Sequence, residues 1–232
     1  MLKKLIQMGY NCNQIRRIFK HYSICRYEPE YLILKIETIF NYLLDLGYTK
    51  EQVIRITLKY PSIFGSKIES ISQKIEDLIT LGYSRQNVFE MIQKHPQILS
   101  YNKDKIMEKG NNLISLGYTK EEAYSMIYNS PYILGLSFNN IKKKIDYYKS
   151  IGIEQHFVRT TMNLMQSVEL SYARYSYLTN ECSETINIKN CHILFYSNAF
   201  FIEKYRINNE TLLMRYKYDI CFNSNKEKVK KI

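Results

Sequence analysis

The stretch from residue 78 to residue 99, LITLGYSRQNVFEMIQKHPQIL, is one copy of a motif that recurs along the chain. Its Leu-Gly-Tyr tripeptide occupies positions 46–48, 81–83 and 116–118, and a weaker Ile-Gly-Ile copy occupies 151–153. Three prolines keep the same interval of 35 residues: Pro61, Pro96 and Pro131. Two independent columns that share one period indicate a tandem repeat, which is typical of a helical solenoid.

Each repeat has the pattern of two helices and a short turn. A first helix is predicted over residues from about 67 to 81, because their apolar side chains share one helical face: Ile68, Ile71, Ile75, Leu78 and Ile79. Gly82 stands where a left-handed residue ends a helix, and Ser84 is suited to cap a second one. His95 ends that helix because a residue before proline disfavours the helical region, and the segment from Pro96 is long enough only for a single turn. We therefore predict an all-α fold, a curved superhelical solenoid of tandem units of about 35 residues.

The repeat continues toward both ends of the chain with changes of spacing. The units are expected to turn near five glycines: Gly9, Gly47, Gly82, Gly117 and Gly152. Beyond Pro131 the spacing shortens to 30 residues, since the segment that begins at Pro131 recurs from Thr161 and from Cys191 without its proline. We predict one helical-repeat domain over residues 1–222 with two degenerate C-terminal units, followed by a basic, disordered tail over 223–232.

The composition favours a polyanionic partner and argues against chemistry at a compact site. Thirty-three Lys and Arg residues against 22 Asp and Glu residues give a net charge of +11. No apolar run is long enough to span a bilayer, so we expect no membrane partner. The five cysteines and four histidines are dispersed. We therefore expect no metal, no cofactor, no small-molecule substrate and no enzymatic activity.

One column of cations recurs in five consecutive units: Lys74, Lys109, Lys144, Arg174 and Lys204. On a helical wheel Lys74 lies at the edge of the apolar face, so two interpretations apply. The column forms a ladder that binds phosphates along one rim of the solenoid, or its long side chains cover the seam between units. We favour the ladder, reasoning that only phosphate binding requires a charge in every unit, and we add the neighbouring Lys142 and Lys143.

Two further columns of cations stay open between surface charge and phosphate contact. The first is on the last turn of the second helix, where interaction with the helix dipole is the favoured reason for a cation: Lys20, Lys59 and Lys94. The second is on the first turn of that helix: Lys50, Arg85 and Lys120. Several tyrosines have the ring faces that stack on splayed bases, although helical spacing favours packing roles for them: Tyr101, Tyr124, Tyr128 and Tyr172.

The period, the Leu-Gly-Tyr-Thr/Ser turn and the Pro-x-Ile-Leu/Phe segment resemble the repeats of the mitochondrial transcription termination factor family over about residues 2–218. The resemblance implies three-helix units, two long and one short, stacked into a curved solenoid with a basic concave face. It also implies binding to nucleic acid, chiefly duplex DNA and in some members organellar RNA, in transcription or RNA maturation.

We therefore predict a non-catalytic, monomeric protein that binds duplex DNA in transcription termination or regulation. An RNA-binding repeat protein in RNA maturation and a protein- or peptide-binding scaffold stay open as alternatives. The scaffold is disfavoured because only three alanines are available for close helix crossings. For the location we favour a bacterial cytoplasm, because no clear targeting extension precedes the first repeat, with a mitochondrion or another organelle as the alternative.

Overall fold

The computed structural model describes residues 2–21, 27–153 and 164–218, and all regular elements in these ranges are helices. By compactness the chain divides into two units, unit 1 with Met1–Asn111 and Ile127–Leu134, and unit 2 with Asn112–Met126 and Gly135–Ile232. The predicted tail, 223–232, lies outside the described residues, as do residues 154–163.

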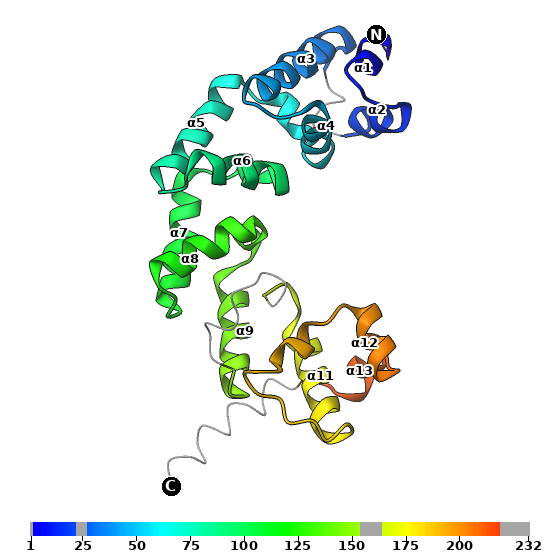
Figure 1. Cartoon of the computed structure of the whole chain (residues 1–232), viewed down its shortest axis with the longest axis vertical. Coiled ribbons are helices and arrows are strands. Elements are labelled where there is room, and N and C mark those ends of the chain that lie inside the picture. The colour runs from blue at the N-terminus through cyan, green and yellow to red at the C-terminus, as the bar shows by residue number, and fades with distance from the viewer. Residues whose placement is uncertain (1, 22–26, 154–163, 219–232) are drawn as a thin grey trace. The chain divides into compact units, whose positions relative to one another are not determined.

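Unit 1 repeats one pattern of first helix, second helix and short 3₁₀ helix (Figure 1). The chain enters through α1 (Leu2–Gln7) and α2 (Cys12–Phe19). The next two repeats consist of α3 (Pro29–Asp45), α4 (Lys50–Lys59) and η1 (Pro61–Gly65), then α5 (Ile68–Thr80), α6 (Arg85–Lys94) and η2 (Pro96–Ser100). The repeat that follows these two has residues in both units: α7 (Lys103–Ser115), α8 (Lys120–Asn129) and η3 (Pro131–Gly135).

The predicted glycine turns and helix caps are confirmed. Gly47 and Gly82 have φ angles of +99° and +102°, in the left-handed region where a Cβ atom is disfavoured. Two residues later, Thr49 and Gln52 form the reciprocal capping box, while the Ser84 hydroxyl accepts from the Asn87 amide. The tyrosine that follows each glycine turns back into the core, with the side chain of Tyr48 only 3% exposed. The glycine turn and the cap therefore position the second helix of each repeat.

The proline-led segments form 3₁₀ helices that fill the core of their own repeat. In η2, Ile98 and Leu99 are buried, and η2 packs against α4, α5 and α6. In η1, Ile63 and Phe64 occupy the corresponding positions. The predicted short turn is therefore a structural third layer in each repeat, and its last carbonyl groups need hydrogen-bond donors from elsewhere.

Unit 2 departs from this pattern. Its described elements are α9 (Phe138–Ser150), α11 (Val168–Asn180), η5 (Cys191–Phe195), α12 (Asn198–Tyr205) and α13 (Asn209–Arg215). Between α11 and η5, residues 181–190 contain no helix where a second helix would stand. There, Asn190 accepts from the Asn187 amide and donates to the Thr185 carbonyl, and such contacts compete with helical hydrogen bonds. This loop accounts for the shorter spacing of the repeat that begins with α11.

The last second helix is α13, which Asn208 caps by accepting from the Thr211 amide. Helix α11 packs against α13, α9 and η5. Among the described residues, no helix combines the length and the apolar character that crossing a membrane requires.

Candidate nucleic-acid interface

The predicted cation column lies on the first helices of the repeats, and most of its members are buried. The exposed fractions of Lys109, Lys144 and Arg174 are 6%, 4% and 1%, and Lys74 is half-buried. Lys204, on α12, is exposed. Burial lowers the pKa of Lys109 and Lys144, and it lowers the pKa of Arg174 to about 10.

Two of these cations donate to carbonyl groups at the same place in the repeat. The Lys74 ammonium donates to the carbonyl oxygen of Tyr101 at 2.9 Å, and the Arg174 guanidinium donates to that of Tyr196 at 2.6 Å. Each of these tyrosines directly follows a 3₁₀ helix, η2 or η5. The cation therefore ties the first helix to the point where the chain leaves the third layer of the same repeat.

Lys144 and Arg174 share a second carbonyl position. Lys144 donates to the carbonyl oxygen of Leu164, and Arg174 donates to that of Leu194 at 2.9 Å. Both leucines lie 20 residues after their cation, in the 30-residue register that the sequence predicts. The contacts thus recur with the repeat, as the cations themselves do.

These contacts agree with the packing interpretation of the column. A phosphate that approached Lys144 or Arg174 would have to enter the core and replace a carbonyl acceptor. Phosphate binding by the five column residues stays a prediction, and the carbonyl contacts supply a separate reason for a cation to recur in the repeat.

Lys204 and the two predicted site residues outside the column, Lys142 and Lys143, lie at the surface of unit 2. Lys142 pairs with Asp146 at 2.6 Å, and Lys143 pairs with Glu169 at 2.9 Å. The hydrogen bond from Lys143 is the main reason that the pKa of Glu169 is lowered. The Lys204 ammonium lies over the rings of two tyrosines, Tyr196 at 5.6 Å and Tyr205 at 5.0 Å. Exposed pairs of this kind are weak enough for a ligand to replace them.

A second set of cations lies exposed at the ends of the second helices of unit 1. We call this set the helix-end row: Lys20, Lys59 and Lys94. The Lys59 ammonium donates to the carbonyl oxygen of Lys94 at 3.2 Å, and the Gln97 amide donates to that of Lys59 at 3.0 Å. Helix α4 also packs against α2 and α6, and the three helices succeed one another along unit 1 (Figure 1). The row therefore steps from repeat to repeat.

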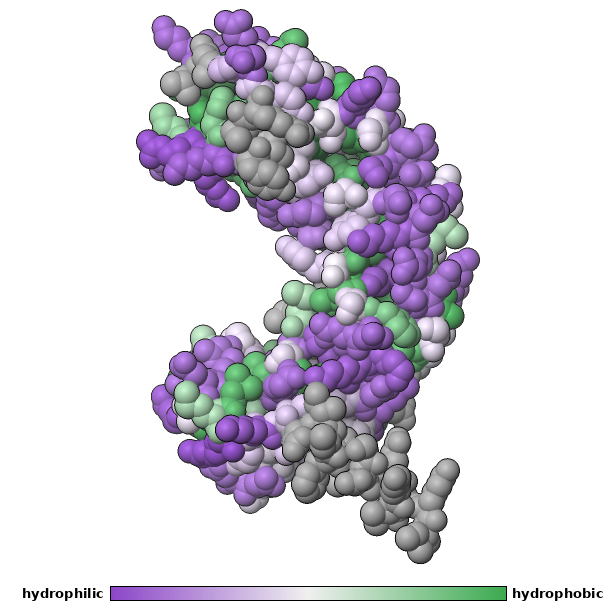
Figure 2. Space-filling model, turned by 180° about the vertical axis from the view of Figure 1, so that it is seen from behind, coloured by the Kyte–Doolittle hydropathy of each residue, from purple (hydrophilic) through white to green (hydrophobic). Residues whose placement is uncertain are grey.

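The surroundings of the row are polar and hold its lysines in the solvent. The Lys94 ammonium pairs with Glu90 at 3.3 Å and lies 5.2 Å from the centre of the Tyr128 ring. Behind it His95 is buried, and its pKa is lowered by burial and, to a lesser extent, by the charge of Lys59. Figure 2 shows hydrophilic residues spread over much of one face of the molecule, with apolar patches between them.

The sequence placed this row at helix ends but did not reveal that Lys59 reaches into the next repeat. Across the described residues, no group of three or more His, Cys, Asp and Glu side chains is arranged to hold a metal ion.

A family model described as mTERF matches residues 1–155, which is more than half of the chain. The chain belongs to the mTERF family. Membership confirms the predicted family and indicates a helical-repeat protein that binds nucleic acid. A comparison with curated proteins found no match. The mTERF match includes all of unit 1, and with it the helix-end row, and it ends before α11.

Proposed function

We propose that this mTERF-family chain binds duplex DNA as a monomer, without catalysis, and acts in transcription termination or regulation. The observation that carries the proposal is the helix-end row: Lys20, Lys59 and Lys94 are exposed at the ends of successive second helices. Lys142, Lys143 and Lys204 are proposed as further phosphate contacts on unit 2. Lysines that neutralise phosphates release counterions from the duplex, which supplies affinity that depends on salt.

The energies of the present contacts favour the row over the buried column. The pair of Lys94 with Glu90 and the bond from Lys59 to a carbonyl are exposed, and such contacts contribute at most about 1 kcal/mol. A phosphate oxygen can replace them at little cost. Removing a buried donor, as at Lys144, leaves an unpaired carbonyl that costs about 1–3 kcal/mol.

A salt titration on a labelled duplex, followed by fluorescence anisotropy, tests the proposal. The logarithm of the association constant should fall linearly with the logarithm of the salt concentration, by about 0.9 per neutralised phosphate. Six contacts give a slope of about −5. The triple variant Lys20→Glu, Lys59→Glu, Lys94→Glu should reduce the slope by about 3 without lowering the melting temperature.

A matched control separates the row from the effect of net charge. The variant Lys50→Glu, Arg85→Glu, Lys120→Glu makes the same change of charge at the opposite ends of second helices. If it weakens binding as much as the row variant does, the row has no special part in binding the duplex. Tighter binding to a single-stranded RNA of equal length than to the duplex would contradict the choice of DNA.

A further inference from the structure

Unit 2 carries a row of aromatic side chains and a cation at its surface, at intervals of four residues. We call it the aromatic row: His192, Tyr196, Phe200 and Lys204. The ring centroids of His192 and Tyr196 are 5.7 Å apart, and those of Tyr196 and Phe200 are 4.5 Å apart. The Lys204 ammonium lies 5.6 Å from the Tyr196 centroid. Tyr196 therefore contacts the other three members of the row, which together cross from η5 to α12.

The aromatic row is exposed, although the residue that follows Phe200 in the sequence is buried. Phe200 is 47% exposed, whereas its neighbour Phe201 is fully buried and fills the core of unit 2. His192 is also exposed, and Tyr196 is half-exposed. Because Phe201 already supplies the core contact of α12, packing does not require a second phenylalanine on the outer side of the helix.

Arg174 holds the backbone beneath the row. Its guanidinium donates to the carbonyl oxygens of Leu194 and Tyr196, and it lies 4.4 Å from the centre of the Phe201 ring. Ser197 lies between Tyr196 and Phe200 in the sequence. Its hydroxyl accepts from the Phe200 amide and so fixes the start of α12. Rings on a backbone held in this way lose little freedom when a ligand binds, which favours affinity.

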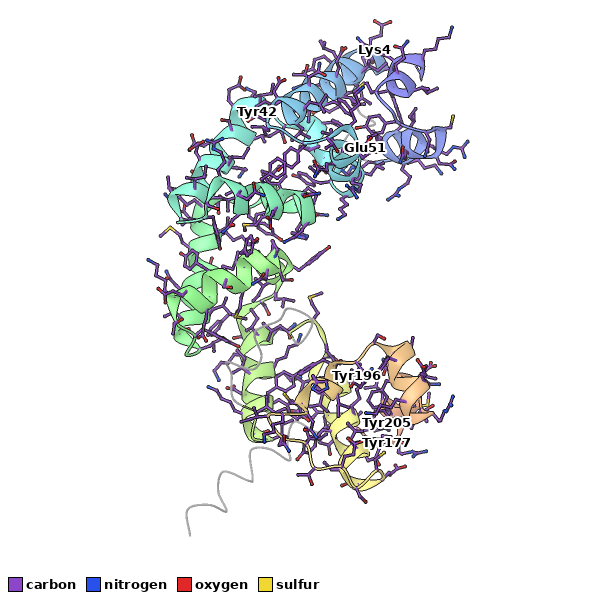
Figure 3. The ribbon with its side chains drawn as sticks, in the orientation of Figure 1. Lys4, Tyr42, Glu51, Tyr177, Tyr196 and Tyr205 are labelled. Atoms are coloured by element: carbon purple, nitrogen blue, oxygen red, sulfur yellow. The ribbon has the colours of Figure 1, made fainter. Side chains whose placement is uncertain are left out.

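The chemistry of this surface fits unpaired bases. Lys204 lies over Tyr196 and over Tyr205, which is the last residue of α12, and Figure 3 labels both tyrosines. Ring faces that stack on bases, together with cations that contact the backbone, are the two components of surfaces that bind single strands. Lys189 and Arg206 are further exposed cations at either end of the row.

The single strand is taken as DNA because DNA is the ligand of the proposed function. The Ser197 hydroxyl and the Asn198 side-chain oxygen accept from backbone amides of unit 2. The ring faces and the cations of this surface are the groups that would contact the strand.

We propose that the aromatic row is a stacking platform for the unpaired bases of single-stranded DNA. This inference rests on the proposed function, because it takes DNA as the ligand of the chain, and it adds a second site of different chemistry. The helix-end row binds phosphates of the duplex, whereas the aromatic row binds exposed bases. Arg174 is a positioning residue for the aromatic row.

The first test is the affinity of the full chain for a fluorescein-labelled oligothymidylate of about twelve nucleotides, which is within the range of single-strand sites. Phe200→Ala should weaken binding about tenfold, and Phe200→Leu should weaken it as much, because both remove the ring. Phe200→Tyr should retain the affinity of the original chain. Met214→Ala, at a side chain that is 72% exposed on α13, is the matched control and should change nothing.

Three outcomes of this test would overturn the platform. Full binding by Phe200→Leu would show that the surface takes any apolar contact, as a protein partner does. Full binding by Phe200→Ala would show that the row does not contact the strand. Oligouridylate that binds tenfold tighter than oligothymidylate would exclude DNA as the ligand. The exposed position of Phe200 predicts that all variants melt at the same temperature, which checks the fold.

A spectroscopic test reports stacking directly. The chain contains no tryptophan, so Phe200→Trp introduces a single indole into the aromatic row. Stacking on a base should quench its emission when oligothymidylate is added, and emission that stays constant while the strand binds would overturn the proposal.

The two proposals fail separately. Loss of duplex binding in the helix-end variant, with oligothymidylate binding intact, supports both sites. If oligothymidylate quenches the indole emission but the chain does not bind the duplex, the proposed function is overturned. The aromatic row is then still a stacking platform.

Discussion

Cations recur on both helices of the repeat, and the two sets differ in what surrounds them. On the first helices, Lys144 and Arg174 are buried and donate to carbonyl groups of their own repeat. On the second helices, Lys59 and Lys94 are exposed at successive helix ends. The comparison teaches that periodic charge has two sources, a ligand that repeats along the protein and an internal need that recurs in every unit.

The internal need is visible in the third layer. The 3₁₀ helices η2 and η5 each end in carbonyl groups that lack helical donors, and a cation on the first helix supplies one. The expectation that only phosphate binding requires a charge in every unit overlooked this demand. A long cationic side chain suits it well, because its stem packs along the apolar face while its end reaches the carbonyl.

Among the substitutions that test this comparison, the largest effect on the free energy of unfolding is expected at Arg174. Arg174→Met removes the donor to four acceptors: the carbonyls of Leu194 and Tyr196 and the side-chain oxygens of Gln166 and Asn209. Among the described residues, only the Leu194 carbonyl keeps another donor, the Gln166 side-chain amide. Each unpaired buried acceptor costs about 1–3 kcal/mol, so the free energy of unfolding should fall by about 3 kcal/mol or more. Urea denaturation followed by circular dichroism measures this. A loss below about 1 kcal/mol would mean that the buried cation is not a packing element.

Two neighbouring lysines on α9 sharpen the comparison within one helix. Lys144→Glu places a carboxylate in the core against a carbonyl oxygen and should cost about 3 kcal/mol. Lys142→Glu makes the same change of charge at the surface, where it brings like charges together at Asp146 and should cost about 0.5 kcal/mol. Melting temperatures of the two variants provide the test, and equal losses would contradict the assigned burial.

Two tyrosines on α9 give a third effect, of intermediate size, on the stability of the protein at alkaline pH. Burial raises the pKa of Tyr147 and Tyr148 well above 10, the usual value for tyrosine. The unfolded chain therefore loses these protons first, so the stability that they contribute is present below about pH 10 and is lost as the pH rises further. The expected loss is about 1.4 kcal/mol per tyrosine for each pH unit above 10.

Tyr147→Phe isolates this effect, because the Tyr147 hydroxyl is buried and accepts or donates no hydrogen bond within the described residues. Urea denaturation at about pH 9 and pH 11 should show a smaller loss for the variant than for the original chain. Burial lowers the pKa of Lys144, which raises stability with pH up to about 10.5, and that trend is common to both proteins. Identical losses would refute the raised pKa of Tyr147.

The smallest effect is expected in the helix-end row. Lys94→Ala removes one exposed pair with Glu90 and should cost at most about 0.5 kcal/mol at low salt, and nothing measurable at high salt. The same variant should lower the salt slope of duplex binding by about 0.9. Stability that falls while the slope stays constant would assign Lys94 to packing.

The elements that the sequence predicts well are those encoded within a few adjacent residues. A glycine that allows positive φ, a Thr49–Gln52 box and a proline that ends a helix each act locally, so the turns and caps of unit 1 follow from the sequence. The surroundings of the cation column depend instead on carbonyl groups 20 to 27 residues further along the chain. A helical wheel gives Lys74 the same boundary position for packing and for phosphate binding.

The missing second helix of the repeat that begins with α11 was also beyond the sequence pattern. The shortened spacing signalled a deletion, but the hydrogen bonds among Thr185, Asn187 and Asn190 that replace the helix involve groups that also occur at helix caps.

The position of Arg174 links the interior of unit 2 to its outer surface. One guanidinium joins α11 to η5, α12 and α13 through Leu194, Phe201 and Asn209. A mutation at a site that no ligand touches would therefore shift the rings of Tyr196 and Phe200 and alter recognition. Variants selected for lost binding would then map to the core, and a survey restricted to solvent-facing positions would miss them.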